Sequence, residues 1–287
     1  MIMTGSPFVT TQWLANHIKD ADLRIVDASW YLPQMKRDAD AEFLVQHIPG
    51  AVRFDADAIA DKSTNLPHMI ANPQAFCEAV GALGISDSDQ IVVYDGLGLF
   101  SAARVWWNFK IMGAKNVYVL SGGLPKWMQE DRSVKADYAQ PEAAVFRGAL
   151  RTDAVHAASD LLSLVTGDRV DDLQIVDVRP AARFLGEAPE PRPGLRQGHI
   201  PGSLNLPFSD LVASGQMIAP DAVKDRLKEA GIDTTKPLVA TCGSGITAPI
   251  LNLALAAIEV DAMGVYDGSW AEWGADAALP VINPSAE

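Results

Sequence analysis

The two halves of this chain repeat each other, and this internal repeat limits its fold more than any other sequence feature. The motif His-Ile-Pro-Gly occurs at residues 47–50 and again at 199–202. Four further matches keep the same order along the chain: 23–27 with 173–177, 84–85 with 231–232, 91–96 with 238–243, and 122–127 with 268–273. Because this period has the size of a domain, it predicts two copies of one fold rather than an array of short repeats.

Each copy alternates short apolar strands with helical patterns. In the first copy we expect strands at 25–28, 52–54, 91–94 and 117–120, and helices at 72–83 and 101–112. Gly84 and Gly113 follow the two helices, where glycine commonly ends a helix. This alternation predicts an α/β fold with two tandem domains, each a mainly parallel sheet flanked by helices.

A chain of 287 residues suits two domains. The segment 134–151 is rich in Ala, Pro and polar residues and has no clear period, which is typical of a linker. We therefore expect a first domain over residues 1–137, a linker over 138–151 and a second domain over 152–287.

Charge and cysteine content exclude several classes of protein. The net charge of −13 disfavours nucleic acid and anionic membranes as partners, because both would repel the chain. Two cysteines cannot form a disulfide framework, and they suit a reducing cytoplasm.

We read no signal peptide at the N-terminus, and the longest apolar stretch, 248–260, is too short to span a bilayer. The five histidines lack metal-ligand spacing, so we expect no metal. Gly96-Leu97-Gly98 has no third glycine at Ser101 to complete a dinucleotide-binding motif, and we expect no cofactor.

Cys242 stands between an apolar strand pattern and a helix pattern, in a glycine-rich turn. Backbone N–H groups and the helix N-terminus at such a position stabilise negative charge on the sulfur. The alternative is a buried structural cysteine, the usual state of a lone thiol. The first copy has Asp95 at this position, although a cysteine needed for packing could have served in both copies. The asymmetry favours a specialised thiol in the second copy and an inactive first copy.

A thiol in such a loop suits two reactions. Phosphate ester hydrolysis by a Cys-x5-Arg loop requires Arg at position 248, where this chain has Ala248. A phosphate loop without its cation lacks its main electrostatic contribution. Sulfur transfer remains, because the loop N–H groups could hold an anionic persulfide on Cys242 without an added cation.

The loop 242–247, with the stretches 27–33, 101–107 and 266–270, resembles the rhodanese superfamily. The likeness covers nearly the whole chain and is greatest to the branch that uses 3-mercaptopyruvate, since thiosulfate-using members carry basic residues inside this loop. It implies an enzyme that moves sulfane sulfur from 3-mercaptopyruvate through a Cys242 persulfide to a thiol acceptor, such as thioredoxin or a small thiol, or to cyanide, with release of pyruvate. It also implies a persulfide cradle, formed by Gly243, Ser244, Gly245, Ile246 and Thr247.

The resemblance further implies a set of substrate-binding arginines. Arg183 and Arg192 occupy positions that the family uses for the substrate carboxylate and carbonyl, a role that suits the planar guanidinium fork. The alternative is two exposed arginines that balance Glu187 and Glu190 on an acidic surface. Arg104 resembles a family residue near the cleft between the domains, which implies a role in substrate binding, and its alternative is an ion pair between the domains.

The pyruvate enolate left after sulfur abstraction needs a proton, and Ser244 could donate or relay one. The family places a histidine and an aspartate of the first domain beside this serine. His47 and Asp38 are the matching residues, with Asp40 close enough to confuse the assignment. The alternative for His47 is structural, because His199 stands in the same turn motif of the second copy, and a repeated turn histidine needs no chemistry.

Two other functions stay open at this point. One is a thiosulfate sulfurtransferase, which would show higher kcat/KM for thiosulfate than for 3-mercaptopyruvate. The other is a non-enzymatic persulfide carrier, which would form one persulfide on Cys242 without multiple turnover.

Overall fold

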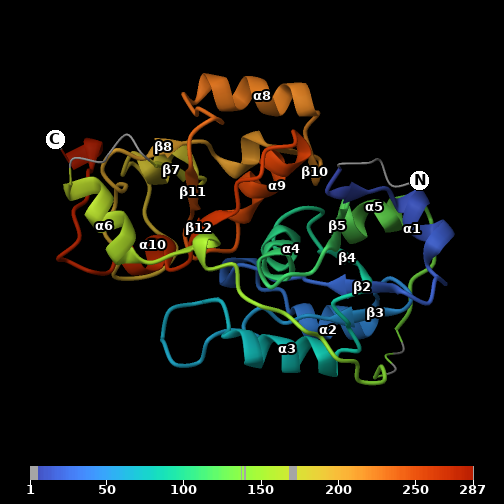
Figure 1. The fold of residues 1–287 in the computed structure, drawn as a ribbon. Coiled ribbons are helices and arrows are strands. Elements are labelled where there is room, and N and C mark those ends of the chain that lie inside the picture. The colour runs from blue at the N-terminus through green and yellow to red at the C-terminus, as the bar shows by residue number, and fades with distance from the viewer. Residues whose placement is uncertain (1–5, 137, 139, 168–172, 287) are drawn as a thin grey trace. The chain divides into compact units, whose positions relative to one another are not determined.

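The chain divides into two compact units in the computed structural model, which describes residues 6–136, 138, 140–167 and 173–286 (Figure 1). The first unit runs through Lys62 and continues with Ile70–Arg151 and Ser214–Met217. The second unit contains Ser63–Met69, Thr152–Ala213 and the chain from Ile218 onward.

Each unit is built on a five-stranded parallel sheet, and the two sheets have the same strand order. The order in the first unit is β1 (Phe8–Val9), β5 (Asn116–Leu120), β4 (Gln90–Tyr94), β2 (Leu23–Asp27), β3 (Ala51–Arg53). The order in the second is β6 (Val155–His156), β12 (Gly264–Tyr266), β11 (Leu238–Thr241), β7 (Gln174–Asp177), β8 (Leu204–Asn205). Matching orders confirm the prediction of two copies of one α/β fold.

The helices also correspond one to one. The first unit has α1 (Thr11–His17), α2 (Ala39–Val45), α3 (Pro73–Ala82), α4 (Ala102–Ile111) and α5 (Gly123–Gln129). Their counterparts are α6 (Ala158–Thr166), α7 (Ala181–Phe184), α8 (Pro220–Glu229), α9 (Pro249–Ala257) and α10 (Ser269–Trp273). Short 3-10 turns occur at Pro33–Met35, Thr152–Ala154, Phe208–Asp210 and Pro284–Ala286, and a small ribbon pairs β9 (Val212–Ala213) with β10 (Gln216–Met217).

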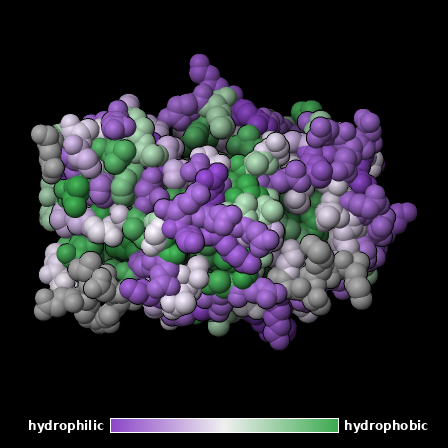
Figure 2. All heavy atoms as spheres, turned by 90° about the horizontal axis from the view of Figure 1, so that it is seen from above, coloured by the Kyte–Doolittle hydropathy of each residue, from purple (hydrophilic) through white to green (hydrophobic). Residues whose placement is uncertain are grey.

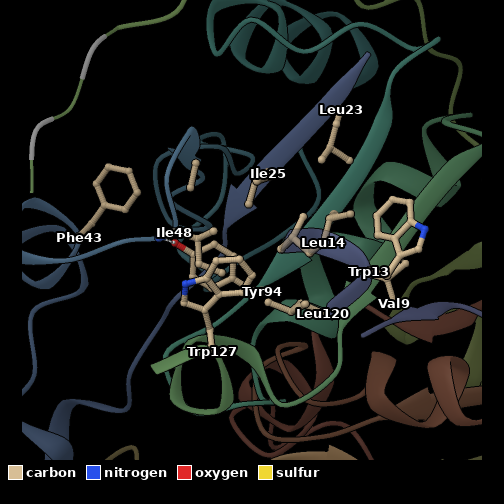
Figure 3. Close-up of a cluster of buried hydrophobic side chains, with 12 residues drawn as sticks. Val9, Trp13, Leu14, Leu23, Ile25, Phe43, Ile48, Tyr94, Leu120 and Trp127 are labelled. Atoms are coloured by element: carbon tan, nitrogen blue, oxygen red, sulfur yellow. Dashed lines mark hydrogen bonds between the residues drawn. The ribbon is translucent and has the colours of Figure 1, made fainter. Parts of the chain in front are cut away.

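Helices cover both faces of the first sheet, as the alternating side chains of β4 require. Val92 and Tyr94 point to one face, where Trp13 and Leu14 of α1 and Trp127 of α5 pack (Figure 3). The other face carries an aromatic cluster in which side chains of α3 and α4 meet Phe54 of the strand end and Phe146. In the second unit α6 and α10 pack on β11 and β12 in the same way.

The expected strands and helices of the first copy are present with ends shifted by one or two residues. Gly84 and Gly113 adopt φ of +74° and +95° just after the last turns of α3 and α4, a left-handed conformation that glycine adopts readily. The edge strands β1 and β6 were not predicted, because two residues are too few to show an alternating pattern.

The described part of the segment 134–151 forms no helix and packs on the first unit. The N–H of Ala144 donates to the carbonyl of Gly81 in α3 at 2.8 Å, and a Cβ at Gly81 would lie 2.7 Å from the Ala144 carbonyl oxygen. Phe146 is buried against α3 and α4. The expected domain boundaries stay a prediction.

Hydrophilic side chains cover much of the molecular face in Figure 2, with smaller apolar areas between them. Among the residues that the structure describes, no helix is both long and apolar enough to cross a membrane.

Candidate active site

Cys242 lies directly after β11, at the carboxyl end of the second sheet, and a turn of six residues connects it to α9. Ligands of parallel α/β sheets bind at this edge. Only 2% of the cysteine is exposed. The thiol is therefore held inside a strand–loop–helix unit of the kind predicted from the sequence.

One N–H group of the loop bonds to the sulfur. Gly245, at φ +81°, donates its N–H to the Cys242 Sγ at 3.2 Å, and this bond stabilises negative charge on sulfur. Within the described residues, the N–H groups of Ser244 and Thr247 have no acceptor. The loop thus offers hydrogen-bond donors beyond those that the thiol itself uses.

Helix α10 fixes the start of this loop from behind. The carbonyl of Cys242 accepts the N–H of Trp270 at 3.0 Å, and that of Gly243 accepts the N–H of Ala271 at 2.8 Å. The N–H of Cys242 donates to the Ser269 hydroxyl at 3.3 Å. With the first two carbonyls held by α10, the loop keeps its shape without help from a ligand.

In the first unit, the side chain of Asp95 fills the corresponding loop. Asp95 is 1% exposed and accepts three backbone N–H groups, from Leu97 at 2.8 Å, Phe100 at 2.7 Å and Ala102 at 2.8 Å. Burial raises the pKa of this carboxyl above its ordinary value, and the three donors oppose the rise. A carboxyl group of the chain itself therefore fills the first loop.

The two loops can be compared position by position, because Asp95 and Gly98 are spaced like Cys242 and Gly245, and both glycines have positive φ. Leu97 and Phe100, which donate to the carboxylate, correspond to Ser244 and Thr247. Two of the three donors that hold Asp95 thus have counterparts without an acceptor in the second unit, whereas the third, Ala102, corresponds to Pro249, which has no N–H.

A buried network of four charges lies in the second unit behind the loop. Asp177, at the end of β7, accepts from the Arg179 Nε at 2.9 and 3.1 Å. Arg179 Nη1 donates to Glu190 at 2.7 Å, and Glu190 also pairs with Arg183. The side chains of Asp177, Arg179 and Glu190 are each 1% exposed. Burial alone would lower the pKa of Arg179, but its two carboxylate partners more than offset this, so the pKa is raised.

Arg183 connects this network to the cysteine loop. Its guanidinium lies so close to Gly243 that a Cβ at that position would be 3.1 Å from Arg183 Nη2. The Arg183 side chain is 19% exposed, against 1% for its partner Glu190. The arginine is thus placed beside the thiol loop with one side in solvent.

The remaining loop and arginine candidates are found in different surroundings. Ser244 is buried, and within the described residues its hydroxyl makes no hydrogen bond. Arg192 is half-buried, eight residues after the end of α7. Arg104 is 1% exposed in α4 of the first unit, with its guanidinium 4.8 Å from the Trp107 ring centroid.

His47 and its repeat partner His199 have matching environments. The Nδ1 of His47 bonds to the carbonyl of Phe43 at 2.7 Å, so this nitrogen carries the proton, and the imidazole stacks on the Phe43 ring at 4.2 Å. His199 repeats both contacts with Phe184, at 2.8 and 3.8 Å. Each histidine also forms a two-way backbone bridge to a later segment, at Lys135 and at Ile282. This likeness supports a structural role for His47.

Asp38 caps α2, and its carboxylate accepts the N–H groups of Asp40 and Ala41, each at 3.0 Å. Asp40 instead pairs with Arg53 at 2.9 Å. No hydrogen bond or ion pair joins Asp38 to His47 in the part of the chain that the structure describes. Both residues belong to the first unit, whereas Cys242 belongs to the second, so their catalytic roles stay predictions.

Sequence reasoning overlooked Arg179 and treated Glu190 as a surface partner. Their position in the sequence could have identified Asp177 and Arg179 as site residues. Asp177 ends a buried strand and Arg179 lies two residues later, at the edge of a parallel sheet where ligands bind. No group of His, Cys, Asp and Glu among the described residues is arranged to hold a metal ion.

Two α/β units of one topology, with a buried thiol at the strand–helix turn of the second, define a tandem sulfur-handling fold of the rhodanese type. The chain belongs to the family of rhodanese-like domains, which it matches over residues 10–130 and again over 157–276. The resemblance stated from the sequence is thereby confirmed.

Comparison with individual proteins shows which rhodanese-like enzymes this chain is similar to. The chain is 41% identical to 3-mercaptopyruvate sulfurtransferase of Escherichia coli over 280 residues, which cover 97% of this chain and 99% of that protein. It is 39% identical to thiosulfate/3-mercaptopyruvate sulfurtransferase 2 of Arabidopsis thaliana, over 99% of this chain and 89% of that protein. The crystal structure of SseA from Escherichia coli, a 3-mercaptopyruvate sulfotransferase, superposes with a TM-score of 0.84 at 38% identity, covering 93% of this chain and 100% of that one.

Proposed function

We propose that this protein is a sulfurtransferase that takes sulfane sulfur from 3-mercaptopyruvate onto Cys242 and passes it to a thiol acceptor. One observation carries the proposal: Cys242 lies in an N–H-lined loop with unused donors, whereas the same loop of the first unit is filled by Asp95. The mercaptopyruvate-using relatives support the choice of donor.

The reaction balances without an external oxidant or reductant. The Cys242 thiolate attacks the sulfur of 3-mercaptopyruvate, so that an S–S bond forms and the C–S bond breaks. The electron pair of the C–S bond leaves with carbon as the enolate of pyruvate, and the proton of the substrate thiol ends on that carbon. An acceptor thiolate then attacks the outer sulfur of the persulfide, breaks the S–S bond and restores Cys242.

Loop residues 243–247 hold the outer sulfur in this proposal. The Asp95 carboxylate serves as an internal guide, because its oxygens extend from the backbone about as far as the outer atom of a persulfide would. The N–H groups of Ser244 and Thr247, equivalent to donors that bind Asp95, are therefore assigned to the persulfide. Fixed N–H dipoles in a buried site stabilise an anion without reorganisation.

Arg183, and with it Arg192 and Arg104, binds the substrate carboxylate and carbonyl in this proposal. We expect Arg183→Ala to raise KM for 3-mercaptopyruvate by about tenfold or more, because a charge-assisted hydrogen bond to the carboxylate is lost. Steady-state pyruvate release measures this change. Arg226→Ala is the matched control, since it removes an exposed arginine of α8 from the same unit and should leave KM unchanged. An unchanged KM in Arg183→Ala would show that Arg183 does not bind the substrate carboxylate.

The proposal includes a proton relay to the pyruvate enolate through Ser244, with His47 and Asp38. His47→Gln and His199→Gln form a matched pair, because both imidazoles make the same two contacts. If His47 relays the proton, kcat falls about a hundredfold in His47→Gln only. If both histidines only hold their turns, the two variants lose similar thermal stability and keep kcat. Chemical unfolding and steady-state kinetics on both variants decide between these roles.

Two alternatives differ in donor and in turnover. Thiosulfate as the main donor is favoured by the name of the Arabidopsis relative, which includes both donors. Pyruvate or sulfite release, measured with each donor as kcat/KM, separates the two substrates. A persulfide carrier without enzymatic activity would release one equivalent of pyruvate and then stop.

Thioredoxin, small thiols and cyanide are the acceptors that we propose. The net charge of −13 argues against nucleic acid and anionic membranes as partners. A reactive free thiol suits the reducing cytoplasm, which we propose as its location.

A further inference from the structure

Glu190 is a buried carboxylate that contacts a residue of the proposed substrate site rather than the surface. We infer that Glu190, held in turn by Arg179, is a positioning residue that aims Arg183 at the substrate carboxylate and thereby sets the affinity for 3-mercaptopyruvate. This inference rests on the proposed function, in which Arg183 binds that carboxylate.

The hydrogen bonds of Arg183 show which edge of its guanidinium group is available to a ligand. Its Nε donates to the two Glu190 carboxylate oxygens at 3.2 and 3.1 Å, and its Nη2 donates to the same carboxylate. Within the described residues, Nη1 has no acceptor. Nη2 also lies against Gly243 of the thiol loop. Glu190 therefore occupies one edge of the guanidinium and leaves the other edge for a ligand beside Cys242.

Glu190 is itself held in place. Arg179 Nη1 bonds to it at 2.7 Å, while Arg179 is fixed by Asp177, by the carbonyl of Gly198 at 2.8 Å and by the Trp270 ring, 4.1 Å from its guanidinium carbon. A free arginine side chain loses much rotamer freedom when it binds a ligand. Because this chain of contacts orders Arg183 during folding, the substrate meets a donor that is already oriented.

The first unit shows that the turn after the strand does not need the arginine. Asp27 and Ser29 stand where the second unit has Asp177 and Arg179, and in both turns the aspartate accepts the N–H two residues later, at 2.8 and 2.9 Å. The turn is therefore conserved between the units without the arginine. Arg179, and with it the hold on Glu190, occurs in the unit that carries the thiol.

The test is kinetic and uses Glu190→Gln, which keeps the shape of the side chain and removes its charge. We expect KM for 3-mercaptopyruvate to rise about tenfold while kcat changes less than about threefold, because binding rather than chemistry is impaired. Asp89→Asn is the matched control, since it removes a buried carboxylate that pairs with Arg24 at the amino ends of the first sheet. This control should leave both constants unchanged.

A double-mutant cycle with Arg183→Ala separates positioning from stability. If Glu190 acts through Arg183, Glu190→Gln adds no further rise in KM once Arg183 is alanine. A full additive effect, or an unchanged KM in the single variant, overturns the inference. If Arg183→Ala alone leaves KM unchanged, the binding role of Arg183 fails and the inference fails with it. Should Glu190→Gln not fold, Glu190→Asp keeps the charge but withdraws it from Arg183, and the same rise in KM is expected.

Discussion

Replacing Cys242 by serine is expected to lower the rate of pyruvate release from 3-mercaptopyruvate by more than about a thousandfold, because a serine hydroxyl is neither ionised near neutral pH nor able to form a persulfide. The loop should keep its shape, since its carbonyls are held by α10 and not by the sulfur. Pyruvate release under saturating donor and acceptor measures the loss. Circular dichroism establishes that the variant is folded.

The second cysteine supplies the matched control. Cys77 is half-buried in α3, and its Sγ lies 4.0 Å from the carbonyl oxygen of Gly148. Cys77→Ser should therefore retain full activity. If Cys77→Ser lost activity, or if Cys242→Ser kept it, the assignment of the nucleophile would be wrong.

Replacing Asp95 by alanine is expected to destabilise the first unit by about 3 kcal/mol or more, because three buried N–H groups lose their acceptor together. Asp95→Asn should be intermediate. The carboxylate oxygen that receives Phe100 and Ala102 can be replaced by the amide oxygen, whereas the amide NH2 would face the N–H of Leu97. Denaturant unfolding, followed by a probe of the first unit, gives the free energies.

Activity distinguishes the structural role of Asp95 from a chemical one. At temperatures where Asp95→Ala stays folded, kcat/KM for 3-mercaptopyruvate should match the unsubstituted protein, because the first loop binds its own carboxylate and no substrate. Unchanged stability in Asp95→Ala would show that the first loop does not depend on this anion.

The sequence predicted the fold well because the repeat gave two independent readings of the same pattern. Buried strands such as β4 and β11, and helices such as α4, are long enough to show their period. The edge strands β1 and β6, with two residues each, depend on pairing with a neighbouring strand and leave no local signal.

The candidate site was less predictable than the fold, because the role of a charged side chain depends on whether the folded chain buries it. Glu187 and Glu190 look alike in the sequence, yet Glu187 is exposed and the Glu190 side chain is buried between two guanidiniums. His47 could be read as a relay or as a turn residue. The repeated motif already related it to His199, and the structure adds the matching contacts with Phe43 and Phe184 that the sequence could not show. Asp95 was correctly paired with Cys242 by the repeat, but its three backbone donors needed the folded loop.

The most direct test of the account is the mass of the protein after reaction with one equivalent of 3-mercaptopyruvate and no acceptor. The intact protein should gain the mass of one sulfur atom, peptide mapping should place this sulfur on Cys242, and one equivalent of pyruvate should appear. Subsequent addition of a thiol acceptor should remove the added mass. Pyruvate release without added mass on Cys242, or a persulfide on Cys77 instead, would contradict the account.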